Sequence, residues 1–175
     1  QRVFRTPSRI ARAKEDFVLF ALGTEGSGGV VQDGREALVR PGEFVYYDTT
    51  RPYELRFDAD FSQTIFQVPR KLLQRRIGSA DRLTAATFSA ERPLERLAFD
   101  FLINLSRVIE TLDAEAQVRL SEQALDLLAM AIGQRLGSEA CHPSTHRSVL
   151  LYRLKAHIQS HLHEPGLSPA GGAAA

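Results

Sequence analysis

The sequence is poor in the residue types that most often carry chemistry. Its one cysteine, Cys141, excludes a disulfide within the chain, and we expect a reducing, cytoplasmic location. All five histidines lie between His142 and His163. No apolar run approaches the roughly 18 residues of a membrane helix, so no membrane partner is expected. The formal net charge of +1 gives no global attraction to nucleic acid.

These absences argue against an enzyme. A metal site in a small β-barrel needs two or three histidines and a carboxylate, and the strand-rich part of the chain has no histidine. The segment GTEGSGG lacks the lysine of a phosphate-binding loop, and no serine sits in a nucleophile elbow. His157 and His161 lie four residues apart but lack the HExxH glutamate, so we interpret them as an exposed helix face. We predict no catalytic residue, no metal and no cofactor.

Residues 1 to about 69 are typical of a β-rich domain. Short runs of β-forming residues alternate with turn residues, and Asp33-Gly34 between two apolar runs is a strong hairpin signal. We predict Glu25–Gly29 as a turn or flexible loop. Six or seven strands at this spacing indicate a sandwich or small barrel. The predicted strands cover residues 16–23, 30–39 (the hairpin), 44–47, 53–57 and 61–68, with a possible further strand near 83–88.

The hydrophobic period changes after Pro69. A short helix is expected there, followed by a long helix that begins at Pro93. A second long helix is predicted over residues 114–136, with Gly137 as its stop. The buried stripe predicted for the first long helix consists of Leu94, Leu97, Phe101, Leu105, Val108 and Leu112.

The second long helix has apolar residues on about half of its circumference or more, which is more than a surface helix needs. One face can pack on the barrel, and the other indicates a homodimer. Alternatively, both faces pack inside one monomer. The predicted dimerisation residues are Leu120, Ala124, Leu127 and Ala131.

Two segments resemble a known family. LKAHIQSHLHEPGLSP (Leu154–Pro169) is similar to the first helix and following turn of the DNA-binding domain in AraC/XylS-type transcriptional regulators. QDGREALVRPGEFVYYDTTRPYELRF resembles the cupin-like sensory domain of the same family, and the two segments stand in the family's order. The resemblance implies an α+β protein whose N-terminal cupin-like β-barrel or jelly roll is followed by dimerisation helices and one helix of a truncated helix-turn-helix domain.

On this basis we expect a sensory barrel over 1–92, a helical dimerisation region over 93–137, a linker over 138–145 and a truncated DNA-binding domain over 146–175. After Pro169 the chain continues as AGGAAA, where the family has further helices. The apolar stripe of the helix over 146–163 has no obvious partner within the chain. We therefore expect no DNA-binding residue in this chain, and DNA contact only through a missing C-terminal domain.

The resemblance also implies a small-molecule effector inside the barrel. Its identity does not follow from the sequence. Tyr46 and Tyr47 point to opposite faces of their strand, so only one of them faces inward. Ordinary core packing is the alternative for the aromatic residues, and a stand-alone cupin-like binding module is the alternative function. The candidate effector-binding residues are Arg12, Phe20, Tyr46, Tyr53 and Phe66.

Overall fold

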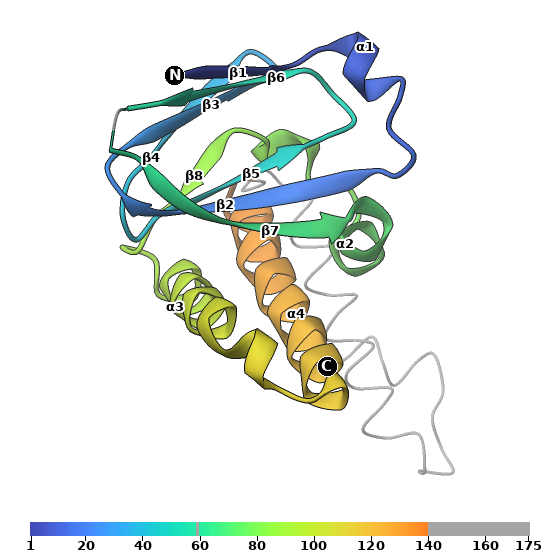
Figure 1. Ribbon diagram of the computed structural model, residues 1–175, viewed down its shortest axis with the longest axis vertical. Coiled ribbons are helices and arrows are strands. Elements are labelled where there is room, and N and C mark those ends of the chain that lie inside the picture. Colours follow the sequence, from blue (N-terminus) through green and yellow to red (C-terminus); the bar gives the residue numbers. More distant parts are fainter. Residues whose placement is uncertain (59, 140–175) are drawn as a thin grey trace, which may run out of the picture. The chain divides into compact units, whose positions relative to one another are not determined.

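In the computed structural model, two four-stranded antiparallel sheets face each other and helices cover the outer side of one of them (Figure 1). The structure describes residues 1–58 and 60–139, and the linker's end and the third helix predicted from the sequence lie outside these residues. The chain divides into two compact units, residues 1–136 and 137–175, and the first of these is described below. The α+β class predicted from the sequence is confirmed.

The strands and helices follow one another through the described residues without long gaps. No described helix is long and apolar enough to cross a membrane. In chain order the elements are β1 (Arg2–Arg5), α1 (Pro7–Ile10), β2 (Phe17–Glu25), β3 (Gly28–Gln32), β4 (Arg35–Val39), β5 (Phe44–Asp48), β6 (Tyr53–Phe57), β7 (Ser62–Pro69), α2 (Arg70–Ile77), η1 (Asp81–Leu83), β8 (Ala86–Phe88), α3 (Pro93–Val108), η2 (Ile109–Thr111) and α4 (Ala114–Glu139).

The strand order is β1-β6-β3-β4 in one sheet and β7-β2-β5-β8 in the other. The hairpin predicted at Asp33-Gly34 is confirmed, because both residues have positive φ (53° and 73°) between β3 and β4. Positive φ at both central residues matches the right-handed twist of the flanking strands.

We predicted Glu25–Gly29 as a turn or flexible loop, and the structure corrects this prediction at the end of the segment. Gly28 and Gly29 belong to β3, and only the turn before them is free of strand pairing. A Cβ atom built on Gly28 would lie 2.6 Å from the ring of Phe61. This glycine therefore makes room for an aromatic ring within a strand, which composition alone cannot distinguish from a flexible loop.

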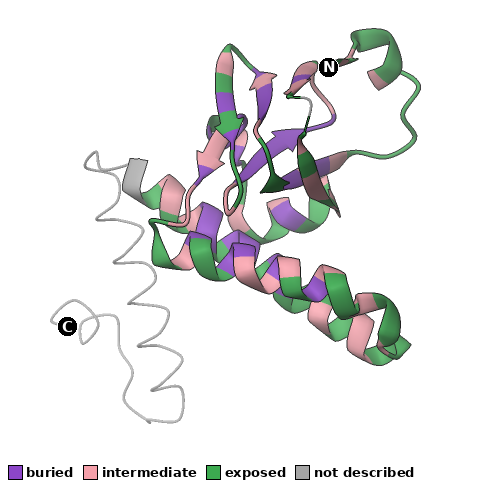
Figure 2. Cartoon of the chain, turned by 60° about the vertical axis from the view of Figure 1, so that its left-hand side comes forward, coloured by how far each residue is buried: buried purple, intermediate pink, exposed green. Residues whose placement is uncertain are grey.

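The alternation of side chains along the strands produces two separate cores. Between the sheets lie Ala21, Val45 and Tyr47, together with Val30 and other residues of the β1-β6-β3-β4 sheet. The opposite face of the β7-β2-β5-β8 sheet packs against the helices, and Figure 2 shows buried positions on the strands and along the helices. We call this second cluster the sheet–helix core; its members include Val18, Phe20, Leu22, Phe44, Tyr46, Phe88, Ala98, Leu102, Leu128 and Ile132.

The buried stripe predicted for α3 is correct at Leu105 and wrong at Leu97 and Val108. Leu97 and Val108 are 56% and 45% exposed, whereas Ala98 and Leu102 are fully buried. The stripe that packs on the sheet also contains Glu95, which is 2% exposed and whose carboxylate lies 3.1 Å from Nη1 of Arg135 on α4. Because Glu95 is charged, a search for apolar residues at helical spacing does not find this stripe. The ion pair with Arg135 makes the burial of Glu95 possible.

Helix α4 ends later than the sequence predicted. Gly137 was predicted to stop the helix, but α4 continues through it to Glu139. A glycine inside a helix costs only about 1 kcal/mol relative to alanine, so it does not end a helix by itself.

Candidate functional site

Three of the five predicted effector residues form one row across neighbouring strands. In the strand register, Phe20 of β2 lies opposite Tyr46 of β5 and opposite Phe66 of β7. The rings of Phe20 and Tyr46 are 5.5 Å apart, and both residues are buried. This row belongs to the sheet–helix core, so it faces the helices and not the space between the two sheets.

The other two predicted residues lie elsewhere. Tyr53 packs between the sheets, where its ring contacts that of Tyr47 at 4.9 Å in an edge-on arrangement. Burial raises the pKa of both tyrosines. Arg12 is exposed in the turn after α1. The structure therefore does not bring the five residues together, and their role in effector binding stays a prediction. Of Tyr46 and Tyr47, Tyr47 faces the space between the sheets and Tyr46 faces the helices.

A cavity of about 210 Å³ opens at the end of the aromatic row. The strand β7 forms one wall, the helix α2 contributes Leu72, and α3 and α4 form the remaining walls. Sequence reasoning identified Phe66 but missed the helical walls, because it placed the effector inside the barrel and assigned one apolar face of α4, which includes Ala124, to a dimer. The lining residues are Phe66, Gln67, Val68, Pro69, Leu72, Leu102, Leu105, Ile109, Ser121, Ala124, Leu125 and Leu128.

The cavity is apolar and has a clear floor and rim. Leu102 and Leu128 are 0% and 1% exposed and lie at its floor, whereas Leu72 and Ser121 are exposed at its rim. Among the described residues, those that line the cavity carry no formal charge. Apolar pockets with few polar groups are typical of small-molecule sites.

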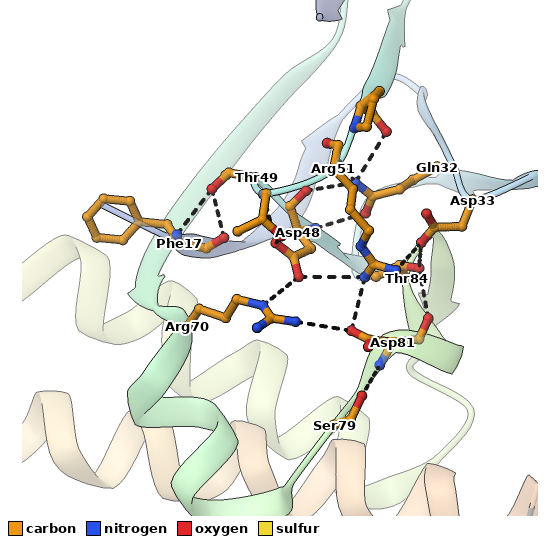
Figure 3. A network of polar contacts seen from close by, with 12 residues as sticks. Phe17, Gln32, Asp33, Asp48, Thr49, Arg51, Arg70, Ser79, Asp81 and Thr84 are labelled. Atoms are coloured by element: carbon orange, nitrogen blue, oxygen red, sulfur yellow. Dashed lines mark hydrogen bonds and ion pairs between the residues drawn. The ribbon is translucent and has the colours of Figure 1, made fainter. Parts of the chain in front are cut away.

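Apart from the apolar cavity, a group of polar residues lies at the end of the sheets near α2 (Figure 3). The carboxylate of Asp48, whose side chain is 0% exposed, accepts a hydrogen bond from Nε of Arg70 at 2.8 Å. Arg51 lies 2.8 Å from Asp33 and 3.1 Å from Asp81. The arginines and aspartates of this group neutralise one another and join β5, α2 and η1, so we interpret the group as structural.

The pKa of Asp48 lies below its ordinary value. Burial alone would raise it, but hydrogen bonds from the amide and hydroxyl of Thr50, and from Arg70, stabilise the carboxylate more strongly. The amide nitrogen of Thr50 lies 2.8 Å from Oδ1 of Asp48. Asp48 is therefore ionised in the folded protein over the physiological range.

The predicted dimerisation residues point largely into the chain's own core. Ala124 and Ala131 are 6% and 1% exposed, and Leu120 and Leu127 are half-buried against the same cluster. The structure thus resembles the alternative in which both faces of α4 pack inside one monomer. Dimerisation itself stays a prediction.

Exposed apolar side chains lie on both long helices, Leu97 and Val108 on α3 and Val118 and Met130 on α4, and those of α3 adjoin a groove. A groove of about 300 Å³ is lined by Phe101, Leu105, Val108 and Leu120, with Asn104 and Arg107 beside them. Leu97, one turn before Phe101, is also exposed. We call Leu97, Phe101, Val108 and Leu120 the outer stripe.

A metal site was not expected from the sequence. Within residues 1–58 and 60–139, no cluster of three or more His, Cys, Asp or Glu side chains has an arrangement that could hold a metal ion.

Comparison with known proteins identifies the fold that carries this cavity. Residues 3–132 match the family described as the AraC-binding-like domain, a range that includes both sheets and the helices over them. The chain belongs to this family. The resemblance to AraC/XylS-type regulators seen in the sequence is thereby confirmed, and the AraC-binding-like domain is the sensory domain of such regulators.

Individual relatives agree with this assignment. The chain is 34% identical over 170 residues to an "Uncharacterized protein in nit 5'region" of Bacillus sp. (strain OxB-1), covering 97% of this chain and 66% of that protein. It is 27% identical over 175 residues to the "Transcriptional activator NphR" of Rhodococcus sp, covering 99% of this chain and 52% of NphR.

Among solved structures, the AraC-like transcriptional activator CuxR has the same fold, with a TM-score of 0.66 and 18% identity over 98% of this chain and 60% of CuxR. The chain thus spans between about half and two thirds of the length of these relatives. Its family and its structural neighbour are transcription-regulator domains and not enzymes.

Proposed function

We propose that this chain is the sensory and dimerisation part of a small-molecule-responsive, DNA-binding transcriptional regulator. The family supports the sensory role, and the relative NphR is a transcriptional activator. The observation that carries the proposal is the cavity beneath α3 and α4, because an effector there would contact the same helices that present the outer stripe. DNA contact is assigned to a part of the protein outside residues 1–139.

The proposed dimer forms through the outer stripe. Leu97 and Val108 are about half exposed, and with the half-buried Phe101 and Leu120 they give α3 and α4 an apolar surface that this monomer covers only in part. A second copy of the chain would bury the same surface on both partners, as two-fold symmetric interfaces do. We propose this seam in place of the interface predicted from the sequence, because Ala124 and Ala131 of that interface are buried in the chain's own core.

Effector binding would act by changing how the two copies meet. A ligand that binds one arrangement of α3 and α4 better than another shifts the dimer toward that arrangement. Couplings of this kind are typically worth about 1–3 kcal/mol, which corresponds to a change of roughly 5- to 150-fold in affinity.

A fusion experiment tests the proposal. The chain is joined to a DNA-binding domain that binds its operator only as a dimer, and repression of a reporter gene is measured in cells. We expect repression by the fusion, loss of repression in the Val108→Asp fusion, and compounds that change the level of repression.

The matched control is Val118→Asp, which changes another exposed valine, on α4 and outside the outer stripe. A fusion that accumulates in folded form but never represses would contradict the dimerisation role. A chain that is monomeric but still binds a small molecule would favour the stand-alone binding module.

A further inference from the structure

We propose that the cavity between β7 and the helices α2, α3 and α4 binds an uncharged, mainly apolar molecule about the size of a substituted benzene ring, and that Leu105 transmits its presence to the outer stripe. The effector role of this ligand rests on the proposed sensory function, whereas the site and the size and polarity of its ligand rest on the geometry below. From the sequence we expected the effector inside the barrel, between the two sheets. The cavity lies outside that space, between one sheet and the helices.

Volume sets the size of the ligand. The cavity measures about 210 Å³. An engineered apolar cavity of about 150 Å³ binds benzene, whereas sites for drug-sized ligands measure roughly 300–1,000 Å³. A ring with one or two small substituents fits between these limits. Nucleotides and disaccharides are too large.

The lining sets the ligand's polarity. Leucine, valine and phenylalanine side chains form most of the walls, and the hydroxyl of Ser121 lies at the rim. An anion or cation in this cavity would lose its hydration without meeting an opposite charge among the lining residues, which is strongly unfavourable. A hydroxyl or similar group on the ligand can be satisfied at Ser121 or at Gln67, the two polar side chains of the lining, so a neutral molecule with one polar end is the best match.

The position of the cavity gives the ligand a path in. Its rim residue Leu72 is 37% exposed, while Leu102 and Leu128 at the floor are almost fully buried. A ligand can therefore enter between α2 and α4 without the sheets separating.

Leu105 connects the cavity with the outer surface of the helices. Its side chain lines both the cavity and the groove that contains Phe101 and Val108, and it is only 6% exposed. Ser121 lines the cavity and its neighbour Leu120 lines the groove. A ligand in the cavity would contact Leu105, and any adjustment of this side chain also changes the groove, because the closely packed core leaves it little free space.

Binding of two matched probes tests the site. Toluene and benzoate have similar size, but only benzoate is charged at pH 7. Each is titrated into the full chain and followed by the NMR signals of methyl groups in the sheet–helix core. We expect saturable shifts with toluene and at least tenfold weaker binding of benzoate. Equal binding of both probes, or no saturable shift with toluene, would overturn the proposal.

Substitutions locate the bound probe. Ala124→Leu fills the cavity and is expected to weaken toluene binding at least tenfold, whereas Ala129→Leu makes the same change at a buried α4 position that does not line the cavity. Toluene binding unaffected by Ala124→Leu overturns the proposal. If a core variant does not fold, Leu72→Trp at the rim replaces it, with Met130→Trp as its exposed control on α4.

Leu105→Ala tests the connection. In the wild-type chain, toluene is expected to change the dimer dissociation constant measured by sedimentation at least threefold. In Leu105→Ala, toluene at concentrations that saturate this variant in the NMR titration is expected to leave the dissociation constant unchanged. An unchanged toluene effect in Leu105→Ala overturns the role of Leu105. Toluene binding combined with an inactive reporter fusion would contradict the proposed function and leave the site intact, while an active fusion without toluene binding would contradict the site alone.

Discussion

Asp48 is the residue at which burial and charge oppose each other most directly. Its side chain is fully buried, yet its pKa is held below the ordinary value by Thr50 and Arg70. Because the folded-state pKa is depressed, Asp48 stabilises the fold above the unfolded-state pKa of about 4, and this contribution is lost as the pH falls through the folded-state pKa.

Asp48→Asn is therefore expected to lower the free energy of unfolding by about 2 kcal/mol at pH 7, since hydrogen bonds to a charged group are lost. The difference from wild type should shrink below about pH 4. Urea unfolding at pH 7 and pH 3 measures both values. Asp100→Asn, in an exposed pair with Arg96, is the control and should change stability little. An equal destabilisation at both pH values would contradict this account.

The buried carboxylate of Glu95 gives a second prediction at this scale. It lies 3.1 Å from Nη1 of Arg135 and accepts a hydrogen bond from the amide of Ser89, so it joins α3 and α4 to the end of β8. Glu95→Ala leaves a largely buried arginine without this partner and should cost about 3 kcal/mol. Thermal unfolding measures the effect, and Arg96→Ala, one residue away in an exposed pair, should cost less than about 1 kcal/mol.

At the scale of elements, α3 shows why a hydrophobic pattern can select the wrong face. The helix carries two apolar stripes, and the more obvious one, with Leu97 and Val108, is the outer one. The stripe that packs on the sheet contains Ala98 and Glu95, a small and a charged residue. The ion pair with Arg135 of α4 and the hydrogen bond from the amide of Ser89 make that stripe suitable for burial, and no periodicity within α3 contains this information.

The exposed stripe of α3 has a measurable consequence. Val108→Asp places a charge in the proposed seam and is expected to weaken dimerisation at least tenfold, about 1.4 kcal/mol, without changing the melting temperature of the monomer. Analytical ultracentrifugation over a concentration series measures the dissociation constant. Val118→Asp, at a 61% exposed position of α4 outside the groove, should leave it unchanged. A wild-type chain that stays monomeric at high concentration would contradict the seam.

At the scale of the whole molecule, local signals in the sequence were sufficient for most strands and insufficient for the site. The hairpin at Asp33-Gly34 and the strand over 53–57 depend on neighbouring residues, and both were predicted correctly. The short strand β1, which pairs with β6 far along the chain, was missed because nothing local marks it. The cavity depends on how α4 meets β7, a contact between residues some fifty positions apart in sequence, so only Phe66 could be named in advance.

The sheet–helix core also has a consequence for how the protein folds during its synthesis. Phe20, Phe44 and Tyr46 emerge from the ribosome early, but the residues that cover them on α3 and α4 follow only between Ala98 and Ile132. Until then the nascent β7-β2-β5-β8 sheet has an uncovered aromatic face. The sheets can close on each other while still attached to the ribosome, but this face must be shielded from other chains until α4 has been translated.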